Sequence, residues 1–218
     1  MFDYNIERSF SWQGTLTKKA AKVIKTFGLD LQRLKDRTVL AACRLSLKPG
    51  DICFITGPSG AGKSVMLREM YGSTLDSKRL NIDDIALERG KTVIDCIEAD
   101  FFESLRILSK AGLSDVFAVL NAPADLSEGQ QYRYKLARAL LSDKKIIFAD
   151  EFCSNLDRIS AAVIAHNIRK IARRSQKIFV LASSHDDLLA DLQPDVIVIR
   201  HLNGSAERIY RNKRAKGL

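Results

Sequence analysis

The segment from Gly57 to Ser64 has the residue types that bind phosphate. It lies between an apolar run that ends at Thr56 and a stretch with helical spacing. Glycines let backbone N–H groups converge on a phosphate, and the N-terminus of the following helix adds positive potential. The lysine of such a loop reaches the terminal phosphates, and the serine after it ligates Mg²⁺. The segment predicts a nucleoside triphosphate site formed by Gly57, Pro58, Ser59, Gly60, Ala61, Gly62, Lys63 and Ser64.

A second group able to do chemistry follows the apolar run Ile146–Ala149, which ends in Asp150 and Glu151. An acid at the end of a buried strand beside a phosphate loop holds Mg²⁺ directly or through water, so Asp150 and Ser64 are the predicted metal ligands. Glu151 is then free to orient or deprotonate the attacking water, which makes it the predicted catalytic base. The alternative is a strand that simply ends in solvated acids.

Strands and helices alternate along the chain, and their order predicts how these groups meet. Short, continuous apolar runs are typical of strands buried on both faces, and apolar residues with helical spacing indicate helices between them. The expected strands cover 39–43, 52–55, 144–149 and 177–182, and the expected helices cover 15–37, 64–71, 102–111, 130–142 and 157–174. This order predicts an α/β fold with a mostly parallel core sheet.

Length and composition narrow the class of protein. The chain has 218 residues, 46% of them hydrophobic, with 4 Pro and 12 Gly, which excludes collagen-like and wholly disordered proteins. No apolar run reaches the length of a membrane span, no secretory signal opens the sequence, and the 4 cysteines form no Cys-x-x-Cys pair. We therefore expect a cytoplasmic protein without disulfide bonds or a zinc site.

The net charge of +9 belongs to the two ends of the chain. Residues 1–40 hold eight basic and four acidic side chains, whereas residues 41–207 hold 22 of each sign. The last residues add five basic side chains and no acid: Arg208, Arg211, Lys213, Arg214 and Lys216. Such runs are usually solvated tails. The alternative is nucleic-acid binding, because Tyr210 interleaves an aromatic ring with these cations.

Three further motifs carry a family resemblance. Leu126–Gln130 resembles the signature motif of ATP-binding cassette (ABC) ATPases, and His185, after the strand 177–182, resembles their switch histidine. A third motif resembles their D-loop: Ser154, Asn155, Leu156 and Asp157. With the phosphate loop and the acidic strand end, these motifs follow the ABC order. The resemblance implies the P-loop NTPase fold, with an antiparallel β portion beside the core sheet and a helical subdomain.

The resemblance also implies how ATP is used. Two chains would form a homodimer on ATP binding and hold two ATP molecules head-to-tail. Ser127, Gly129 and Gln130 would then complete the ATP site of the partner subunit, and His185 would contact the γ-phosphate or the attacking water. Ser127 and Gln130 also have the spacing of a capping box, so a merely well-capped helix is the local alternative.

The sequence departs from transporter ABC ATPases in two places. The interval from Lys63 to Leu126 is short and contains no glutamine, so the family's Q-loop residue is missing, and Glu88 lies roughly where it should fall. No aromatic residue occurs between Gly28 and Ile52, where the adenine-stacking ring is usually found. Phe27 and Trp12 are the candidates for that ring, since stacking tolerates different aromatic side chains.

These features define the expected organisation: a basic N-terminal segment (1–37), an ABC-type ATPase domain (38–207) with a reduced helical subdomain (about 72–142), and a basic tail (208–218). Segments 113–138 and 151–199 resemble soluble ABC ATPases that are often fused to a predicted acetyltransferase domain. That domain could here be a separate chain.

Because the helical subdomain is reduced, the favoured function is a soluble, non-transporter ATPase coupled to an effector protein or nucleic acid. The first alternative is the ATP-binding subunit of a membrane transporter. The second is a nucleotide-gated binding module that is not an enzyme and works through its basic ends.

Overall fold

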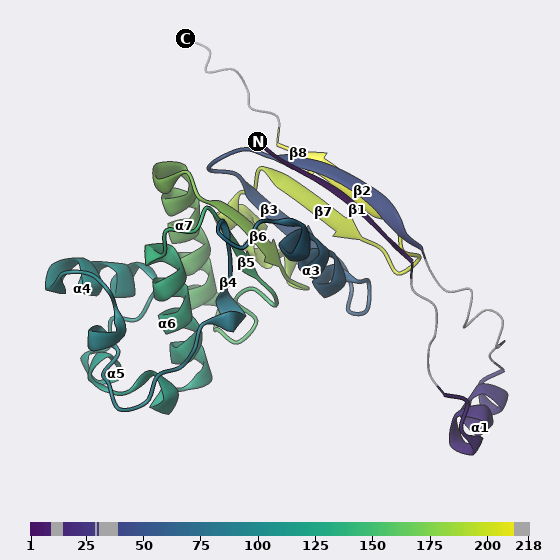
Figure 1. Cartoon of the computed structure of the whole chain (residues 1–218), viewed down its shortest axis with the longest axis horizontal. Helices are drawn as coiled ribbons and strands as arrows, with labels where there is room; N and C mark the ends of the chain where they lie inside the picture. The colour runs from purple at the N-terminus through teal and green to yellow at the C-terminus, as the bar shows by residue number, and fades with distance from the viewer. Residues whose placement is uncertain (10–14, 29, 31–38, 212–218) are drawn as a thin grey trace, which may run out of the picture.

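A six-stranded sheet forms the centre of the molecule (Figure 1). The computed structural model describes residues 1–9, 15–28, 30 and 39–211. The strand order is β4-β5-β6-β3-β7-β8, and all neighbours run parallel except β7 and β8. The strands are β3 (Ile52–Thr56), β4 (Arg79–Asn81), β5 (Ile146–Ala149), β6 (Ile178–Ala182), β7 (Val196–Arg200) and β8 (Ala206–Tyr210). The predicted mostly parallel core is confirmed.

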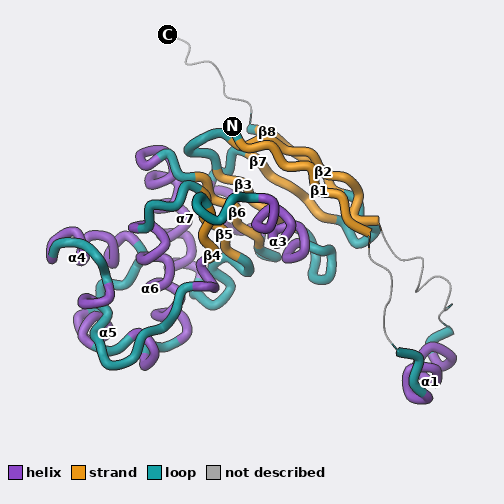
Figure 2. Tube along the Cα trace, in the orientation of Figure 1, coloured by secondary structure: helices purple, strands orange, loops and turns teal. Residues whose placement is uncertain are grey.

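The central strands are buried on both faces because alternate side chains enter two different apolar cores. In β3, Ile52 and Phe54 belong to one core, and Cys53 and Ile55 belong to the other. Helices cover both faces, as continuous apolar strands require. Figure 2 shows α4 to α7 gathered on one side of the sheet and α3 on the other.

The described helices around the central sheet comprise four long and two short ones. The long helices are α3 (Lys63–Ser73), α4 (Phe101–Lys110), α6 (Glu128–Leu141) and α7 (Arg158–Ser175), joined by the short α5 (Val116–Leu120) and α8 (Leu189–Leu192). Single 3₁₀ turns cover Ile82–Asp84, Ile94–Cys96, Pro123–Asp125 and Asp186–Leu188. Each of the four long helices lies on an expected helical stretch.

A separate antiparallel sheet joins β1 (Phe2–Ser9) to β2 (Val39–Leu47). The first residues of the expected N-terminal segment are therefore part of a sheet. The turn after β2 is closed by a hydrogen bond from Asp51 N to Lys48 O of 3.0 Å, and Gly50 has a φ of 82°. Although β2 and β3 flank this turn, they belong to different sheets.

The basic ends of the chain are only partly described. Helix α1 (Lys18–Thr26) replaces the longer helix expected over 15–37, and residues 31–38 lie outside the described ones. In the expected basic tail, Arg208 and Tyr210 belong to β8, whereas residues 212–218 are not described. The domain boundaries at 37 and 207 remain predictions. No helix of the described ranges is both long and apolar enough for a membrane crossing.

Candidate functional site

The phosphate loop connects β3 to α3 at the centre of the sheet. Gly62, with φ 85°, is the N-cap of α3, a left-handed conformation that glycine adopts without strain. The side chain of Lys63 folds back along the loop, and its Nζ donates hydrogen bonds to Gly57 O at 2.9 Å and Pro58 O at 3.1 Å. The loop thus holds one nearly buried ammonium group at the start of a helix, where anions bind.

Gly57 is the glycine of the loop that the surrounding structure requires most strictly. Its φ is 137°, and a Cβ added there would lie 2.2 Å from the carbonyl oxygen of Arg200 at the end of β7. We expect Gly57→Ala to lower the free energy of unfolding by about 2–4 kcal/mol, since backbone must move, and to weaken ATP binding. Gly72→Ala is the control, because nothing lies within 4 Å of that helical position. Urea unfolding of both variants tests this, and equal stabilities would contradict it.

Asp150 and Glu151, the two acids after β5, lie on a backbone turn that could not be predicted from the sequence. Glu151 has a φ of 44° and Cys153 a φ of 59°, conformations that L-residues rarely adopt. The turn is held by hydrogen bonds from Phe152 N to Ala182 O (2.8 Å) and from Cys153 N to the Tyr132 hydroxyl (3.3 Å). Strain of this kind collects at functional sites and persists where the surroundings enforce it.

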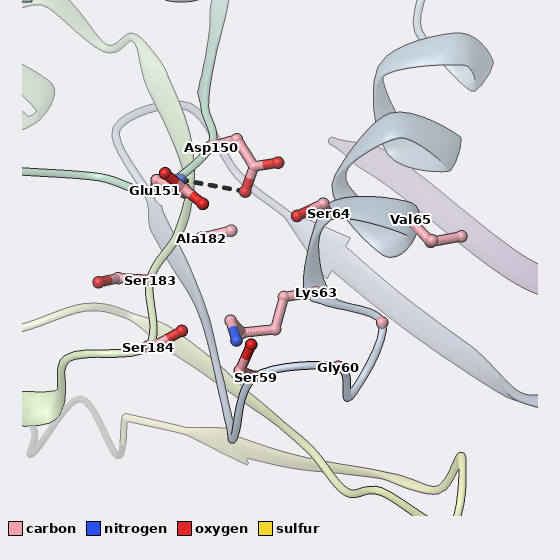
Figure 3. Close-up of a pocket in the computed structure, with 11 residues that line it drawn as sticks. Ser59, Gly60, Lys63, Ser64, Val65, Asp150, Glu151, Ala182, Ser183 and Ser184 are labelled. Atoms are coloured by element: carbon pink, nitrogen blue, oxygen red, sulfur yellow. Dashed lines mark hydrogen bonds between the residues drawn. The ribbon is translucent and has the colours of Figure 1, made fainter. Parts of the chain in front are cut away.

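A cleft of ≈ 290 Å³ brings the loop and the acids together. In Figure 3 the Asp150 carboxylate faces Ser64 at the first turn of α3, and Glu151 lies beside it. Glu151 N donates a 3.0 Å hydrogen bond to Asp150 Oδ1. The cleft is lined by Ser59, Gly60, Gly62, Lys63, Ser64, Val65, Asp150, Glu151, Ala182, Ser183 and Ser184.

Most predicted phosphate and metal residues therefore share one cleft, and the remaining loop residues support it. Gly57 and Pro58 hold Lys63 Nζ through their carbonyls, as described above. Ala61 does not line the cleft and is buried. Ser183 and Ser184 are additions that sequence analysis missed; both follow β6, whose end lies beside that of β5 in the sheet.

The predicted signature motif forms the N-terminus of α6. Ser127 is the N-cap, and its hydroxyl accepts a hydrogen bond from Gln130 N at 3.4 Å while its own N–H donates to Gln130 Oε1 at 3.1 Å. The predicted capping box is thus confirmed. None of Ser127, Gly129 and Gln130 lines the described cleft of this chain. Their predicted role at a partner's ATP site remains a prediction.

The predicted D-loop packs against the signature motif. A Cβ on Gly129 would lie 3.3 Å from the Leu156 side chain and 3.5 Å from Asn155 O, so the absence of a side chain there permits close packing. Asp157 caps α7 by accepting a hydrogen bond from Ser160 N at 2.9 Å, and this bond lowers the pKa of the Asp157 carboxyl.

His185 lies outside the phosphate cleft. It lines a neighbouring pocket with Ser154 and Leu156 of the D-loop, and its backbone N–H donates to Ser183 Oγ at 3.1 Å. His185 therefore lines the same pocket as the D-loop residues, whereas Lys63 lines the phosphate cleft. Its predicted catalytic contact stays a prediction.

Glu88, which the sequence places roughly where the family's Q-loop glutamine falls, lies within the helical region. Its carboxylate accepts hydrogen bonds from the Tyr134 hydroxyl at 2.5 Å and from Arg138 Nη1 at 2.8 Å, within the helical region. Although burial acts to raise it, the pKa of Glu88 is lowered overall by these hydrogen bonds and by the charge of Arg138. Glu88 stabilises the packing of α6 and does not line the cleft.

Asp83 lies in the 3₁₀ turn that follows β4, the neighbour of β5 in the sheet. In the register of β4 and β5, Asn81 pairs with Phe148, and Asp83 follows two residues later, as Asp150 does in β5. Burial raises the pKa of the Asp83 carboxyl. The positive charge of Lys135 lowers this pKa in part, and the negative charge of Asp150 raises it further. Asp83 does not line the cleft.

Arg200 supports the phosphate loop from behind and was also missed. Its side chain is 1% exposed, and Nε donates to Ala61 O at 3.3 Å, while Nη1 has no hydrogen-bond partner among the described residues. Burial lowers the pKa of this guanidinium. A strand-ending arginine is normally assigned to the surface, so no local signal identifies it.

We expect Arg200→Met to weaken ATP binding while changing the free energy of unfolding by no more than about 1 kcal/mol. The apolar side chain removes a buried, incompletely paired cation, which offsets the lost hydrogen bond. It also removes positive charge behind the phosphate loop. Thermal unfolding and ATP titration of the variant measure the two effects, and unchanged ATP affinity would contradict the assigned role.

The adenine-stacking ring remains unassigned. Phe27 ends α1, is 73% exposed, and does not line the cleft. Trp12 lies outside the described residues.

Comparisons with known proteins agree with this geometry. No family model matches the chain. The zinc import ATP-binding protein ZnuC of Ruegeria pomeroyi is 32% identical over 181 residues, which cover 75% of this chain and 69% of the relative. The aliphatic sulfonates import ATP-binding protein SsuB of Albidiferax ferrireducens is 29% identical over 177 residues, 71% of this chain and 63% of its own length. The cell division ATP-binding protein FtsE of Streptococcus pneumoniae is 25% identical over 198 residues, which cover 75% of this chain and 86% of the relative.

Solved structures show the same fold. A dimeric ATP-binding cassette in a post-hydrolysis state with ADP and Pi gives a TM-score of 0.62 at 21% identity, covering 78% of this chain and 90% of that one. A bacterial Atm1-family ABC exporter with ATP bound gives a TM-score of 0.60 at 19% identity, and the match covers 77% of this chain and 35% of the exporter chain. The predicted cassette fold is confirmed. The relatives are named as import and cell-division proteins, so the expected likeness to the acetyltransferase-fused subgroup is not supported.

Proposed function

The chain belongs to the ABC family of ATPases, and we propose that it is the ATP-binding subunit of a membrane transport complex, hydrolysing MgATP as a head-to-tail dimer. The import and cell-division names of its relatives favour this alternative over the soluble, non-transporter ATPase expected from the shortened helical region. They give no support for nucleic acid, an effector or an acetyltransferase chain as a partner. The chain spans 63% of the length of one of these relatives, SsuB.

One observation carries the ATPase assignment: the cleft unites the phosphate loop with Asp150 and Glu151 (Figure 3). Lys63 supplies positive charge to the β- and γ-phosphates, and the N-terminus of α3 adds its dipole. Backbone N–H groups of the loop, free of side chains at Gly60 and Gly62, surround the phosphate oxygens.

The oxygen donors of the cleft fit Mg²⁺. Within the described ranges, no cluster of three or more His, Cys, Asp or Glu side chains could hold a metal by itself. Mg²⁺ in nucleotide sites is bound by one or two protein oxygens together with phosphates and water, and Ser64 and Asp150 supply such a set. When bound, the ion neutralises charge on the phosphates.

Glu151 is the proposed base of the hydrolysis step. A water molecule attacks the γ-phosphorus and gives a proton to the Glu151 carboxylate, while the bond to the bridging oxygen breaks to release ADP and phosphate. The strained turn at Glu151 directs this side chain into the cleft beside Asp150. His185, in the adjoining pocket, would contact the γ-phosphate or the attacking water once the dimer closes.

The N-terminus of α6 is the group that a second subunit would supply. The capped start of this helix presents Ser127 and Gly129 at a surface outside the chain's own cleft. A helix N-terminus favours the negative charge of a γ-phosphate. Docking two chains head-to-tail would bring this N-terminus to the partner's ATP, with the D-loop at the seam beside Gly129.

An exposed apolar surface on α4 and α5 is the proposed docking site for the membrane subunit. Monomeric proteins rarely expose such clusters without a binding role. Within a short stretch of chain, large apolar side chains are exposed at Phe101 (62%), Phe102 (78%), Val116 (66%), Phe117 (81%) and Leu120 (59%).

Fractionation of the native organism's cells tests the membrane assignment. After the membranes are dissolved in detergent, the chain should co-purify with a polytopic membrane protein, and Phe102→Ser with Phe117→Ser should abolish this co-purification while ATP hydrolysis is retained. Leu202→Ser is the matched control, because this side chain is 68% exposed far along the sequence in the β7–β8 turn. A wild-type chain that co-purifies with no polytopic membrane protein would contradict the proposal.

A further inference from the structure

Helix α1 is amphipathic and packs against nothing in the described structure. The apolar side chains of Ala20, Val23 and Ile24 form one stripe along the helix, with Phe27 at its C-cap, and Leu16 lies just before the N-cap Thr17. None of the helix residues Lys18–Thr26 is buried. Figure 1 shows α1 apart from both sheets. Its apolar stripe is therefore free to meet a surface outside the described chain.

The opposite side of α1 is strongly basic. Lys18, Lys19, Lys22 and Lys25 lie away from the apolar stripe on a helical projection, and the helix contains no acid. Long lysine side chains can rest their methylene groups on an apolar layer while the ammonium groups reach polar headgroups. An apolar stripe between lysines is the pattern of helices that lie in a membrane interface.

Local interactions define the ends of α1 but do not account for its stability. The Thr17 hydroxyl accepts a hydrogen bond from Ala20 N at 3.2 Å, and Phe27 N donates to Val23 O at 3.0 Å before Gly28 turns left-handed with φ 60°. Isolated helices shorter than about 12 residues are marginal in water. A helix of 9 residues with capped ends thus needs a surface against its apolar stripe.

We propose that α1 binds the surface of an anionic lipid bilayer, with its apolar stripe in the headgroup region and its lysines at the acidic headgroups. The four lysines of α1, with no acid in the helix, favour a negatively charged lipid surface. The apolar stripe selects lipid over nucleic acid, because phosphate backbones attract lysines without any need for Leu16 or Val23. This binding would hold the chain at the membrane independently of a membrane-protein subunit.

Vesicle flotation of the full chain tests the proposal. The chain should float with vesicles of phosphatidylcholine and phosphatidylglycerol in equal parts, and not with phosphatidylcholine alone. Binding at about 0.1 M salt should fall at about 1 M salt, where the Debye length shrinks from about 10 Å to about 3 Å. Failure to float with the anionic vesicles, or equal flotation with both kinds, would overturn the proposal.

Two variants separate charge from apolar contact. Lys19→Gln with Lys22→Gln should weaken anionic-vesicle binding by about fivefold per lysine. Leu16→Ser with Val23→Ser leaves the charge intact and should weaken it by at least about tenfold. Lys48→Gln with Lys91→Gln, which removes two exposed lysines elsewhere, is the control and should bind like wild type.

The pattern across variants excludes other ligands. All variants should keep wild-type ATP binding, because α1 has no buried residue on which folding depends. If the serine variant floats like wild type while only the glutamine variant and added DNA change binding, the ligand is a polyanion and not lipid. If the Lys48→Gln, Lys91→Gln control loses binding as strongly as the α1 variants, vesicle binding depends on the overall charge of the protein and not on α1. Either result would overturn the proposal.

Discussion

Lys63→Ala is expected to lower ATP affinity by at least about a hundredfold and to abolish hydrolysis. The Lys63 side chain is 9% exposed, and Gly57 O and Pro58 O hold its ammonium group at the base of the cleft. Removing one partner of a largely buried charge pair costs about 2–5 kcal/mol, and about 2.7 kcal/mol corresponds to a hundredfold change in affinity.

Titration calorimetry with MgATP measures the effect of Lys63→Ala. Lys91→Ala, which removes an exposed lysine, is the matched control and should bind ATP like wild type. Unfolding of Lys63→Ala without nucleotide checks that the loop still folds. If the variant binds ATP normally, the cleft is not the nucleotide site. If it keeps full cellular activity without binding ATP, the chain works as a binding module and not as an ATPase.

Glu151→Gln is expected to reduce the rate of hydrolysis by about 10²–10⁴-fold while ATP binding is retained. The amide has nearly the shape of the carboxylate and can occupy the same strained turn at φ 44°, but it cannot accept the proton of the attacking water. The loss should therefore appear in kcat and leave the affinity for ATP largely unchanged.

Single-turnover phosphate release measures this step directly. Glu98→Gln is the matched control, since the Glu98 side chain is 89% exposed and lies outside the cleft. A Glu151→Gln protein that hydrolyses ATP at the wild-type rate would assign the base to another residue. Asp83 and His185 would then be the residues to test.

The phosphate loop and the strand end at Asp150 and Glu151 could be predicted because their chemistry lies in short contiguous segments. A loop with the glycines and lysine of this one has few other uses between a strand and a helix. The capping box at Ser127 was predictable for the same reason. In each case the interacting residues are within a few positions of one another, so local spacing carries the information.

Residues that join the site through long-range packing could not be predicted. Ser183 and Ser184 line the cleft because β6, which they follow, lies between β5 and β3 in the sheet. Arg200 is buried because β7 ends directly behind the phosphate loop, against the usual exposure of arginine. The β1–β2 pairing likewise joins residues far apart in the chain.

The short helical region is the departure from transporter ABC ATPases that the structure describes most fully. The helical region between Lys63 and Leu126 is short, yet α4 and α5 expose the apolar side chains that a protein partner would cover. These observations weaken the sequence-based preference for a soluble ATPase without a membrane partner.

We propose that two chains close around MgATP and that hydrolysis opens them. Sedimentation velocity of Glu151→Gln with saturating MgATP tests it most directly, with MgADP and the double variant Lys63→Ala, Glu151→Gln as controls. We predict a dimer with MgATP and monomers in both controls. A Glu151→Gln protein that binds MgATP yet stays monomeric would contradict the head-to-tail dimer.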